Sequence, residues 1–417
     1  MKELGQKIRQ EFPIFRNNQR AAPNGASVPL CFLDSAVSSQ KPQCVIDAMS
    51  YFLAHDYGSV HRGAYQLSIR ASEKYESARA QVASFIGKNV KPSQIVFTRG
   101  TTESLNILSL GIAATRLTPA SRIVIPAIEH HANFVPWQQA ALHADCELAY
   151  IPLVGQRGTE LRLDLNAAEK LITANTAVVA LAHVGNVLGQ VNPVAQIAAL
   201  AKKVGALVIL DCAQSISCIE GNPFDWGVDA IAFSGHKLYG PTGVGVLAAR
   251  SDLLESLPPL LTGGGMISAV TLDESTWASG VSKFEAGTPP TTEVIGLARA
   301  IAWVEEVGRS RIHDHSARLA GIFAERIAGI RGIQTFYPGS GQETIVSFRH
   351  ESIHAHDLAT ILDASNVAMR AGHHCAWPLA RLLGVDALVR ASFAAYSDED
   401  DVEQAVEAIK NAIYFLN

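Results

Sequence analysis

Between about residues 90 and 250, the chain alternates short β-branched and apolar runs with stretches that carry helical signals. This alternation is typical of a parallel sheet whose strands are joined by crossover helices. Several runs are apolar at every position, as expected for strands that are covered on both faces. The strand candidates are residues 95–97, 123–125, 177–181, 207–210 and 230–233. We therefore predict an α/β fold with a doubly wound, mostly parallel sheet.

The rest of the chain predicts a second domain. The chain has 417 residues, of which 48% are apolar, enough for about two packed domains. We expect a large domain over residues 31–291 and a smaller α+β domain over residues 292–417. The smaller domain should contain an apolar helix at 294–307, a strand at 345–348 and an amphipathic helix at 402–415. Residues 1–30 should form an N-terminal segment that packs near the small domain.

Composition argues against several kinds of partner. With 34 basic and 39 acidic residues the net charge is −5, so nucleic acid is a poor candidate ligand. No apolar run approaches the ~20 residues that span a bilayer, and residues 1–9 lack the apolar core of a signal peptide. Six cysteines at irregular spacing fit neither a disulfide framework nor a paired zinc pattern. We expect a soluble, cytoplasmic protein with no membrane contact.

Polar residues follow each strand candidate. These clusters are residues 98–103, 129–133, 183–186, 211–214 and 234–237. In open α/β sheets, ligands bind beyond the carboxyl ends of the strands. The sequence therefore predicts one crevice that collects all five clusters.

Lys237 directly follows a buried strand candidate. A surface lysine in a turn is the commoner case, but a lysine in a desolvated crevice has a lowered pKa and forms Schiff bases with carbonyl cofactors. Asp211, 26 residues earlier, ends the preceding strand candidate. It is either a helix N-cap or the carboxylate that keeps a pyridine nitrogen protonated in pyridoxal phosphate.

A phosphate cradle is also predicted. The run Gly100-Thr101-Thr102-Glu103 reads as a helix start with Thr101 or Thr102 near the N-cap. A helix N-terminus of this kind suits a phosphate group. Ser234 and His236 could supply further donors.

Taken together, these runs resemble the class V aminotransferase superfamily. The resemblance rests on Ser234-Gly235-His236-Lys237-Leu238-Tyr239-Gly240-Pro241-Thr242-Gly243, on residues 98–103 and on Glu129-His130-His131-Ala132-Asn133. Arg370-Ala371-Gly372-His373-His374-Cys375-Ala376 is similar to the Suf/Csd branch of cysteine desulfurases and selenocysteine lyases. The similarity runs from Glu11 to the last helix. It implies the fold-type I, aspartate aminotransferase-like fold of pyridoxal 5'-phosphate (PLP)-dependent transferases.

For the cofactor, the resemblance implies that Lys237 carries PLP as a Schiff base. Asp211 would pair with the pyridine nitrogen, Gln214 would approach the phenolic oxygen, and His130 would stack on the ring and move protons. The phosphate would be bound by Thr101, Thr102, Ser234 and His236, with Thr288 donated by the partner subunit of a homodimer.

For the substrate, the resemblance implies that Asn186 and Arg390 hold a carboxylate, a task that suits the two-pronged guanidinium. Arg370 and His373 would be additional contacts. We interpret His131, His183 and His374 as structural, because histidines are often satisfied in a core or a turn.

Cys375 distinguishes between the candidate functions. A buried cysteine is usually a small apolar residue, and zinc binding is disfavoured because adjacent residues rarely reach one tetrahedral ion together. Pro378 and Gly384 bracket a short helix after Cys375. The N-terminus of that helix and Arg370 would favour the thiolate, the form that acts as a nucleophile.

The resemblance therefore implies a PLP-dependent cysteine desulfurase. It would convert L-cysteine to L-alanine, take the sulfur as a persulfide on Cys375, and pass it to a small acceptor protein for iron–sulfur cluster assembly or sulfur trafficking. A selenocysteine lyase acting on L-selenocysteine, and an aminotransferase or kynureninase-like enzyme without need of Cys375, are the alternatives. A non-catalytic scaffold is disfavoured because Lys237, Asp211, His130 and Arg390 are all present.

Three features depart from the usual pattern of this family. Cys212 stands where the family has glycine, and Val37 where it has alanine. The stretch at residues 17–29 is also longer than the usual turn.

Overall fold

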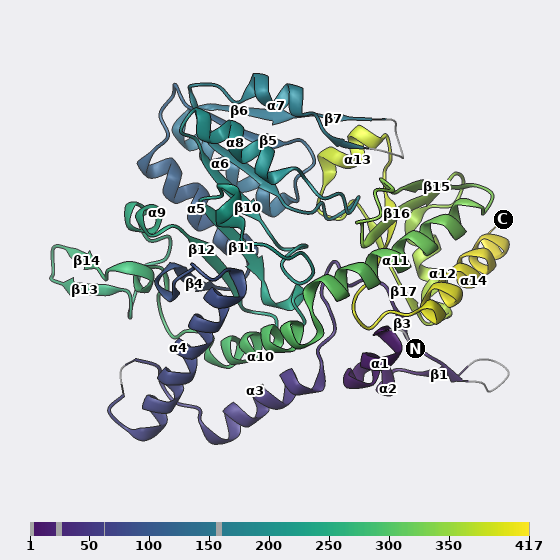
Figure 1. Cartoon of the computed structure of the whole chain (residues 1–417), viewed down its shortest axis with the longest axis horizontal. Helices are drawn as coiled ribbons and strands as arrows, with labels where there is room; N and C mark the ends of the chain where they lie inside the picture. The colour runs from purple at the N-terminus through teal and green to yellow at the C-terminus, as the bar shows by residue number, and fades with distance from the viewer. Residues whose placement is uncertain (1–3, 22–26, 62, 156–160, 417) are drawn as a thin grey trace.

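The computed structural model describes residues 4–21, 27–61, 63–155 and 161–416. A seven-stranded sheet forms the middle layer of the larger of its two bodies (Figure 1). The strands lie in the order β4-β12-β11-β10-β9-β5-β6. Six of them point the same way, and β12 runs antiparallel to both of its neighbours. Their bounds are β4 (Ile95–Thr98), β5 (Arg122–Pro126), β6 (Glu147–Ile151), β9 (Thr176–Ala182), β10 (Leu207–Asp211), β11 (Ala230–Ser234) and β12 (Gly245–Ala249).

All five predicted strands are confirmed, and the structure adds β6 and β12. The sequence pattern does not predict β12, because β12 is not joined to β11 by a crossover helix. It follows β11 after only the 3-10 turn η5 (Gly235–Lys237) and a short loop, and it pairs antiparallel with β11. Gly245 is required there, because a Cβ at this position would lie 2.4 Å from the Cα of Gly100.

Two cores cover the two faces of this sheet. Alternate residues of each strand enter opposite cores, as the two-residue period of a strand requires; Val208 and Leu210 enter one, Leu207 and Ile209 the other. Helices α4 (Gln66–Ile86), α8 (Val194–Lys203) and α10 (Thr291–Val307) contribute to the first core. Helices α5 (Thr101–Thr115), α6 (Val135–Ala144) and α9 (Ser251–Ser256) contribute to the second.

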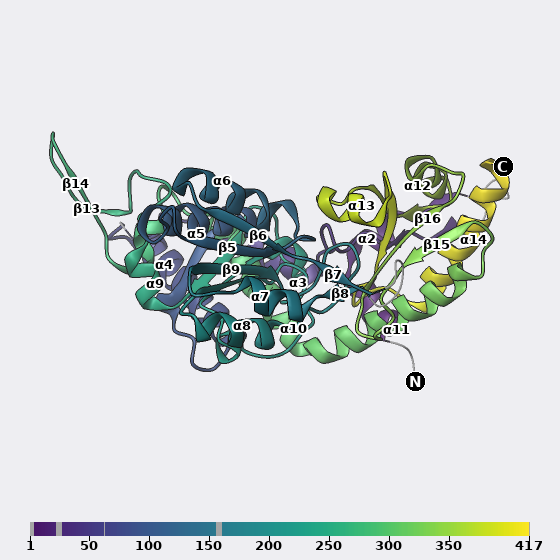
Figure 2. The same cartoon turned by 90° about the horizontal axis from the view of Figure 1, so that it is seen from above.

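A second, smaller body contains a four-stranded antiparallel sheet of order β15-β16-β19-β18 (Figure 2). Its strands are β15 (Ile333–Phe336), β16 (Ile345–His350), β18 (Arg370–Gly372) and β19 (Leu388–Ser392). Helices α11 (Arg309–Ala328), α12 (Ala355–Ala364) and α14 (Glu399–Leu416) share a third core with it. The predicted strand at 345–348 and helix at 402–415 are confirmed, and Val402, Ala405, Val406 and Ile409 are buried as the helical pattern indicated.

The connection between the two bodies runs through α10 and α11. The predicted helix at 294–307 is confirmed as α10, and its apolar face shares a core with the large sheet and α4. Gly308, at φ +95°, ends α10 in a backbone conformation that favours glycine, and α11 then enters the smaller body (Figure 1). The domain boundary at residue 292 stays a prediction.

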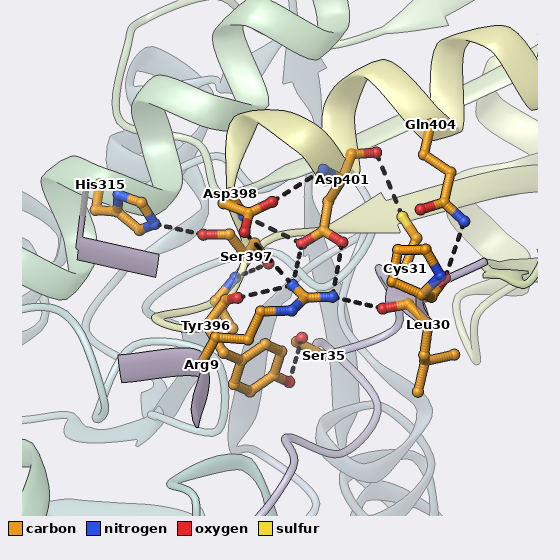
Figure 3. A network of polar contacts seen from close by, with 12 residues as sticks. Arg9, Leu30, Cys31, Ser35, His315, Tyr396, Ser397, Asp398, Asp401 and Gln404 are labelled. Atoms are coloured by element: carbon orange, nitrogen blue, oxygen red, sulfur yellow. Dashed lines mark hydrogen bonds and ion pairs between the residues drawn. The ribbon is translucent and has the colours of Figure 1, made fainter. Parts of the chain in front are cut away.

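Arg9 of the N-terminal segment forms a largely buried ion pair with Asp401 of the smaller body. Arg9 donates to both carboxylate oxygens of Asp401, at 2.7 and 3.1 Å, and to the carbonyls of Tyr396 and Leu30 (Figure 3). Cys31 then opens a short parallel pairing of β3 (Cys31–Phe32) with β17 (Val367–Ala368). The Sγ of Cys31 donates to the carbonyl of Asp401.

The remaining elements are short or lie at the periphery. Part of the long stretch at 17–29, residues 22–26, lies outside the described residues. None of the helices within the described ranges combines the length and apolar character needed to cross a bilayer.

The remaining helices and strands are α1 (Leu4–Ile8), α2 (Pro13–Asn17), β1 (Arg20–Ala21), β2 (Ser27–Val28), α3 (Gln43–His55), η3 (His131–Asn133), β7 (Leu153–Val154), β8 (Arg162–Leu163), α7 (Leu165–Leu171), η4 (Pro223–Trp226), β13 (Ile267–Val270), β14 (Ser275–Trp277), η6 (Gly280–Phe284) and α13 (Trp377–Leu383), with single turns η1 (Arg9–Glu11) and η2 (Pro92–Gln94).

Candidate active site

A cavity of about 260 Å³ lies where the carboxyl ends of the parallel strands meet the smaller body. It collects residues from all five polar clusters, as predicted. The smaller body contributes side chains from β18, β19 and the loop between β18 and α13. The lining residues are Ala36, Val37, Thr101, Thr102, His130, Ala132, Ala182, Val184, Asn186, Asp211, Ala213, Gln214, Ser234, His236, Lys237, Arg370, His374, Cys375 and Arg390.

Lys237 and Asp211 come from neighbouring parallel strands. Asp211 is the last residue of β10, and Lys237 lies in the turn after β11. Burial of the amine lowers the pKa of Lys237 to about 8, although the nearby Asp211 carboxylate opposes this change. Burial raises the pKa of Asp211, while the amide of Ala213, 2.8 Å from Oδ1, and Lys237 lower it. The Lys237 amine is therefore more often neutral, and more nucleophilic, than an exposed lysine.

His130 is held as a neutral ring. Its Nδ1 accepts a hydrogen bond from the amide of Ala132 at 3.0 Å, so we assign the ring proton to Nε2. Burial, and then the charge of Lys237, lower the pKa of His130 to about 3. Across the physiological pH range, His130 is therefore a neutral donor at Nε2.

The first turn of α5 faces the same cavity. Gly100, and not Thr101 or Thr102, occupies the N-cap position, and the helix begins at Thr101. Gly100 has no side chain with which to cap this helix. Ser234 Oγ accepts from the Thr101 amide at 2.8 Å and lies 2.7 Å from Thr101 Oγ1. Hydroxyls and a helix N-terminus together form a donor set that suits a phosphate.

Arg390 brings a buried positive charge to the opposite wall. Its side chain is 2% exposed, and Nη1 donates to the Asn186 carbonyl at 2.7 Å. Nε and Nη2 make no hydrogen bond with any described residue. Burial lowers the pKa of Arg390 to about 10. Buried N–H groups are rarely left unpaired, so this guanidinium is suited to an anionic ligand.

The amides of Asn186 and Gln214 are already engaged. Asn186 Nδ2 donates to the His374 carbonyl at 2.6 Å, and Gln214 Nε2 donates to the Ala36 carbonyl at 2.8 Å. Both residues line the cavity. Their predicted contacts with substrate and cofactor stay predictions.

Cys375 is exposed and lines the cavity that Lys237 also lines. Its backbone and that of His374 have positive φ values, +56° and +52°, which are uncommon for residues other than glycine. The short helix predicted after it is confirmed as α13, with proline in its first turn and Gly384 as a left-handed C-cap. In the described part of the chain, no group of three or more His, Cys, Asp or Glu side chains is placed to hold a metal ion.

Two predicted site residues lie outside this cavity. His373 packs on Trp377, with 4.9 Å between the ring centroids. Thr288 lines a second cavity, together with Arg79 and Glu285. Within one chain, Thr288 therefore does not reach the residues around Lys237.

His374 does line the cavity, although the sequence pattern suggested a purely structural role. Its Nε2 lies 3.1 Å from the Leu388 carbonyl, so Nε2 carries the proton. Its Nδ1 is buried without a partner among the described residues. Burial, followed by the charge of Arg390, lowers the pKa of His374 to about 3. No local sequence signal indicates this orientation, because it depends on the positive φ values of the loop.

The residues present fit PLP. The cavity joins a buried amine, a buried carboxylate, a helix N-terminus with hydroxyls, and a guanidinium with two nitrogens that make no hydrogen bond with a described residue. These are the groups that a carbonyl, a pyridine nitrogen, a phosphate and an amino-acid carboxylate require.

The fold is that of the fold-type I, PLP-dependent transferases. Residues 31–405 match the family model of class V aminotransferases, and the chain belongs to this family. It is 41% identical over 407 residues to the cysteine desulfurase of Salmonella gallinarum, covering 97% of each chain. It is 39% identical over 413 residues to that of Haloferax volcanii, covering 97% of this chain and 96% of the relative.

Solved structures agree with this assignment. The cysteine desulfurase CsdA of Escherichia coli, in an S-sulfonic acid form, superposes with a TM-score of 0.89 at 34% identity, covering 99% of this chain and 98% of that one. The apo cysteine desulfurase of Thermococcus onnurineus NA1 gives a TM-score of 0.91 at 34% identity, covering 99% of each chain. The resemblance inferred from the motifs is confirmed.

Proposed function

We propose that this protein is a PLP-dependent cysteine desulfurase, which converts L-cysteine to L-alanine and takes the sulfur onto Cys375. The observation that carries the proposal is the position of an exposed cysteine on the wall of the cavity that holds Lys237 and Asp211. An aminotransferase needs the amine and the carboxylate but has no use for this thiol. The relatives named above are cysteine desulfurases, which supports the same choice.

Seven residues of the cavity would hold the cofactor. When bound, PLP acts as an electron sink that allows bonds at the α and β carbons of an amino acid to break. Lys237 would anchor it, and Lys237 then takes the α-proton of the substrate on Nζ, a role that suits an amine with a pKa of about 8. The seven residues are Thr101, Thr102, Asp211, Gln214, Ser234, His236 and Lys237.

The other wall would bind the substrate and receive the sulfur. Arg390 would grip the substrate carboxylate through Nε and Nη2, which make no hydrogen bond with a described residue although Nη2 lies 3.5 Å from Asp34 Oδ1, with Asn186 beside them. The Cys375 thiolate attacks the substrate sulfur, so that an S–S bond forms while the Cβ–S bond breaks. The electron pair of the broken bond stays on the carbon, which takes a proton and becomes the methyl group of alanine. His130, a neutral donor at Nε2 that lines the same cavity, would move such protons.

We also propose a homodimer and a sulfur acceptor. Thr288 lies in a separate cavity of its own chain, which fits donation of Thr288 to the active site of the partner subunit. A persulfide on the exposed Cys375 must be unloaded before the next turnover. A small cytoplasmic protein with its own cysteine, serving iron–sulfur cluster assembly or sulfur trafficking, is the acceptor that we propose.

The test is a comparison of products. Purified protein is supplied with PLP, dithiothreitol and L-cysteine, with and without 2-oxoglutarate as an amino-group acceptor, and L-alanine, glutamate, pyruvate and sulfide are quantified. Equal amounts of alanine and sulfide support the desulfurase. Transfer of the amino group to a keto acid, without sulfide, would identify an aminotransferase instead. Parallel assays with L-selenocysteine show which of the two chalcogen substrates has the higher kcat/KM.

A further inference from the structure

Glu129 is a buried carboxyl group that lies directly before His130 in the chain. Glu129 is 1% exposed and does not line the active-site cavity, whereas His130 does. Its Oε1 accepts a hydrogen bond from the amide of Ala182 at 3.0 Å, and its Oε2 accepts from Asn133 Nδ2 at 2.7 Å. Glu129 therefore acts on the cavity only through its neighbours.

Trp137 sets the direction of these hydrogen bonds. Its indole Nε1 can only donate, and it donates to Asn133 Oδ1 at 3.0 Å. The Nδ2 of Asn133 must then face Glu129, so Glu129 receives an N–H group at each of its two oxygens. Trp137 and Asn133 are fully buried, so a mismatched donor could not turn to solvent.

The site therefore requires glutamate and not its isostere glutamine. Burial raises the pKa of Glu129 to about 8, although both hydrogen bonds oppose this change. A carboxyl group can accept at both oxygens whether it is ionised or protonated, whereas the amide of glutamine has one acceptor end and one donor end. The donor end would meet an N–H group at either position.

The hydrogen bonds of Glu129 join the loop of His130 to the strand beside Asp211. Asn133 lies in η3, and its main-chain amide donates to the His130 carbonyl at 2.8 Å. Ala182 is the last residue of β9 and pairs with Asp211 of β10. Because Glu129 connects Asn133 to Ala182, the position of His130 relative to Asp211 depends on both bonds.

We propose that Glu129 is a positioning residue, which holds the His130 ring at the cofactor by accepting hydrogen bonds from both Asn133 and Ala182. The inference rests on the proposed function in taking PLP as the cofactor that His130 contacts. Loss of either bond lets η3 shift. The ring shifts with it, because the amide of Ala132 in η3 also donates to the ring Nδ1 of His130.

A pair of variants that exchanges the carboxyl group and the amide tests this proposal. Glu129→Gln alone brings a buried N–H group against that of Ala182 or of Asn133. Adding Asn133→Asp gives the new amide an acceptor, and the new carboxyl group still accepts from Trp137 Nε1. The double variant Glu129→Gln/Asn133→Asp thus restores all three hydrogen bonds with the same number of carboxyl groups.

The readouts are the dissociation constant of PLP, from titration of the cofactor-free protein, the visible spectrum of the bound cofactor, and Tm. We expect Glu129→Gln to raise the PLP constant about tenfold, within the penalty for one buried donor left without an acceptor, and to shift the absorbance maximum. The double variant should return both quantities close to the wild-type values.

Glu343→Gln is the matched control. Glu343 is also 1% exposed and accepts at both oxygens, from Ser340 Oγ at 2.6 Å and from the Gly341 amide at 3.1 Å. It lies in the loop between β15 and β16, and neither it nor these two partners line the cavity. Glu343→Gln should lower Tm but leave the PLP constant and the spectrum unchanged.

Two results overturn the proposal. One is a PLP constant and spectrum of Glu129→Gln that match those of Glu343→Gln, and the other is a double variant as impaired as Glu129→Gln. If Glu129→Gln does not fold, Trp137→Phe replaces it, since loss of the indole donor frees Asn133 to turn. Trp137→Phe should then raise the PLP constant, and an unchanged constant also overturns the proposal.

The outcome is separable from that of the proposed function. A protein whose PLP constant depends on Glu129 as expected, but which forms no alanine from L-cysteine, would contradict the desulfurase assignment alone. A protein that forms alanine, but whose PLP constant and spectrum do not depend on Glu129, would contradict the role of Glu129 alone.

Discussion

The main-chain amide of His131 donates a hydrogen bond to the main-chain carbonyl of Cys375, 2.8 Å away. This bond joins the loop of the smaller body that carries the exposed thiol to the residue next to His130. The ring of His131 also accepts from the amide of Trp377 at 3.2 Å. The loop is thus tied down at Cys375 and again two residues later, so the main chain is fixed while the thiol stays accessible.

Replacing Cys375 by serine should stop alanine formation without loss of the cofactor. A serine hydroxyl cannot accept the sulfur, and loss of a catalytic nucleophile lowers kcat by about 10³-fold or more. Alanine production from L-cysteine and the visible spectrum of the bound cofactor are measured on the same sample. Cys146→Ser is the matched control, because Cys146 is half-buried and lies outside the cavity. Full alanine production by Cys375→Ser would return Cys375 to a structural role.

Attachment of PLP to the cofactor-free protein should depend on pH through Lys237. The neutral amine is the nucleophile, and burial lowers the pKa of Lys237 from 10.5 to about 8. The rate should therefore rise with pH and level off near pH 8, about two pH units below an ordinary lysine. Stopped-flow absorbance follows the reaction, and Lys237→Ala should give no covalent band. A rate that still rises steeply at pH 10 would show that Lys237 is not desolvated.

The sequence predicts the architecture well because its signals are local. Apolar runs identify five strands of the large sheet, and the polar residues after them identify the cavity. Strand β12 could not be predicted from strand–helix–strand patterns, because it pairs antiparallel with β11 without a crossover helix. The orientation of His374 depends on positive φ values, and the contact of Asp34 with Arg390 joins residues far apart in the chain. Such features depend on tertiary packing and leave no periodic trace in the sequence.

Buried His183 should make the protein less stable in mild acid. His183 packs edge-on against Trp226, and burial lowers its pKa from 6.5 to about 4. Because the folded pKa lies below the unfolded value, the unfolded chain binds the extra proton, and stability falls as the pH drops below about 6.5. Between pH 7 and pH 5 this amounts to about 2 kcal/mol.

His183→Gln removes this proton-binding group, so the fall in Tm between pH 7 and pH 5 should shrink by a few degrees. Differential scanning calorimetry at a fixed scan rate measures the change. His143→Gln, at an exposed position, serves as the control. An identical pH dependence of Tm in wild type and His183→Gln would contradict the prediction.

The ion pair between Arg9 and Asp401 should stabilise the attachment of the N-terminal segment. The two side chains are 18% and 3% exposed. Arg9→Ala would leave the Asp401 carboxylate buried without its partner, at a cost of about 3–5 kcal/mol. Arg299→Ala breaks the exposed pair with Glu306, which is worth about 1 kcal/mol or less. Thermal unfolding should therefore show a clearly larger fall in Tm for Arg9→Ala, and equal falls would contradict the prediction.

The most direct test of the account is a single turnover with L-cysteine, followed by mass spectrometry of the peptide that contains Cys375. The PLP-loaded protein is mixed with one equivalent of L-cysteine without reductant, alkylated and digested. We predict a mass gain of one sulfur atom on Cys375, matched by one equivalent of L-alanine. Alanine formed without this mass gain, or with the gain on another cysteine, would contradict the assignment of Cys375 as the residue that accepts the sulfur.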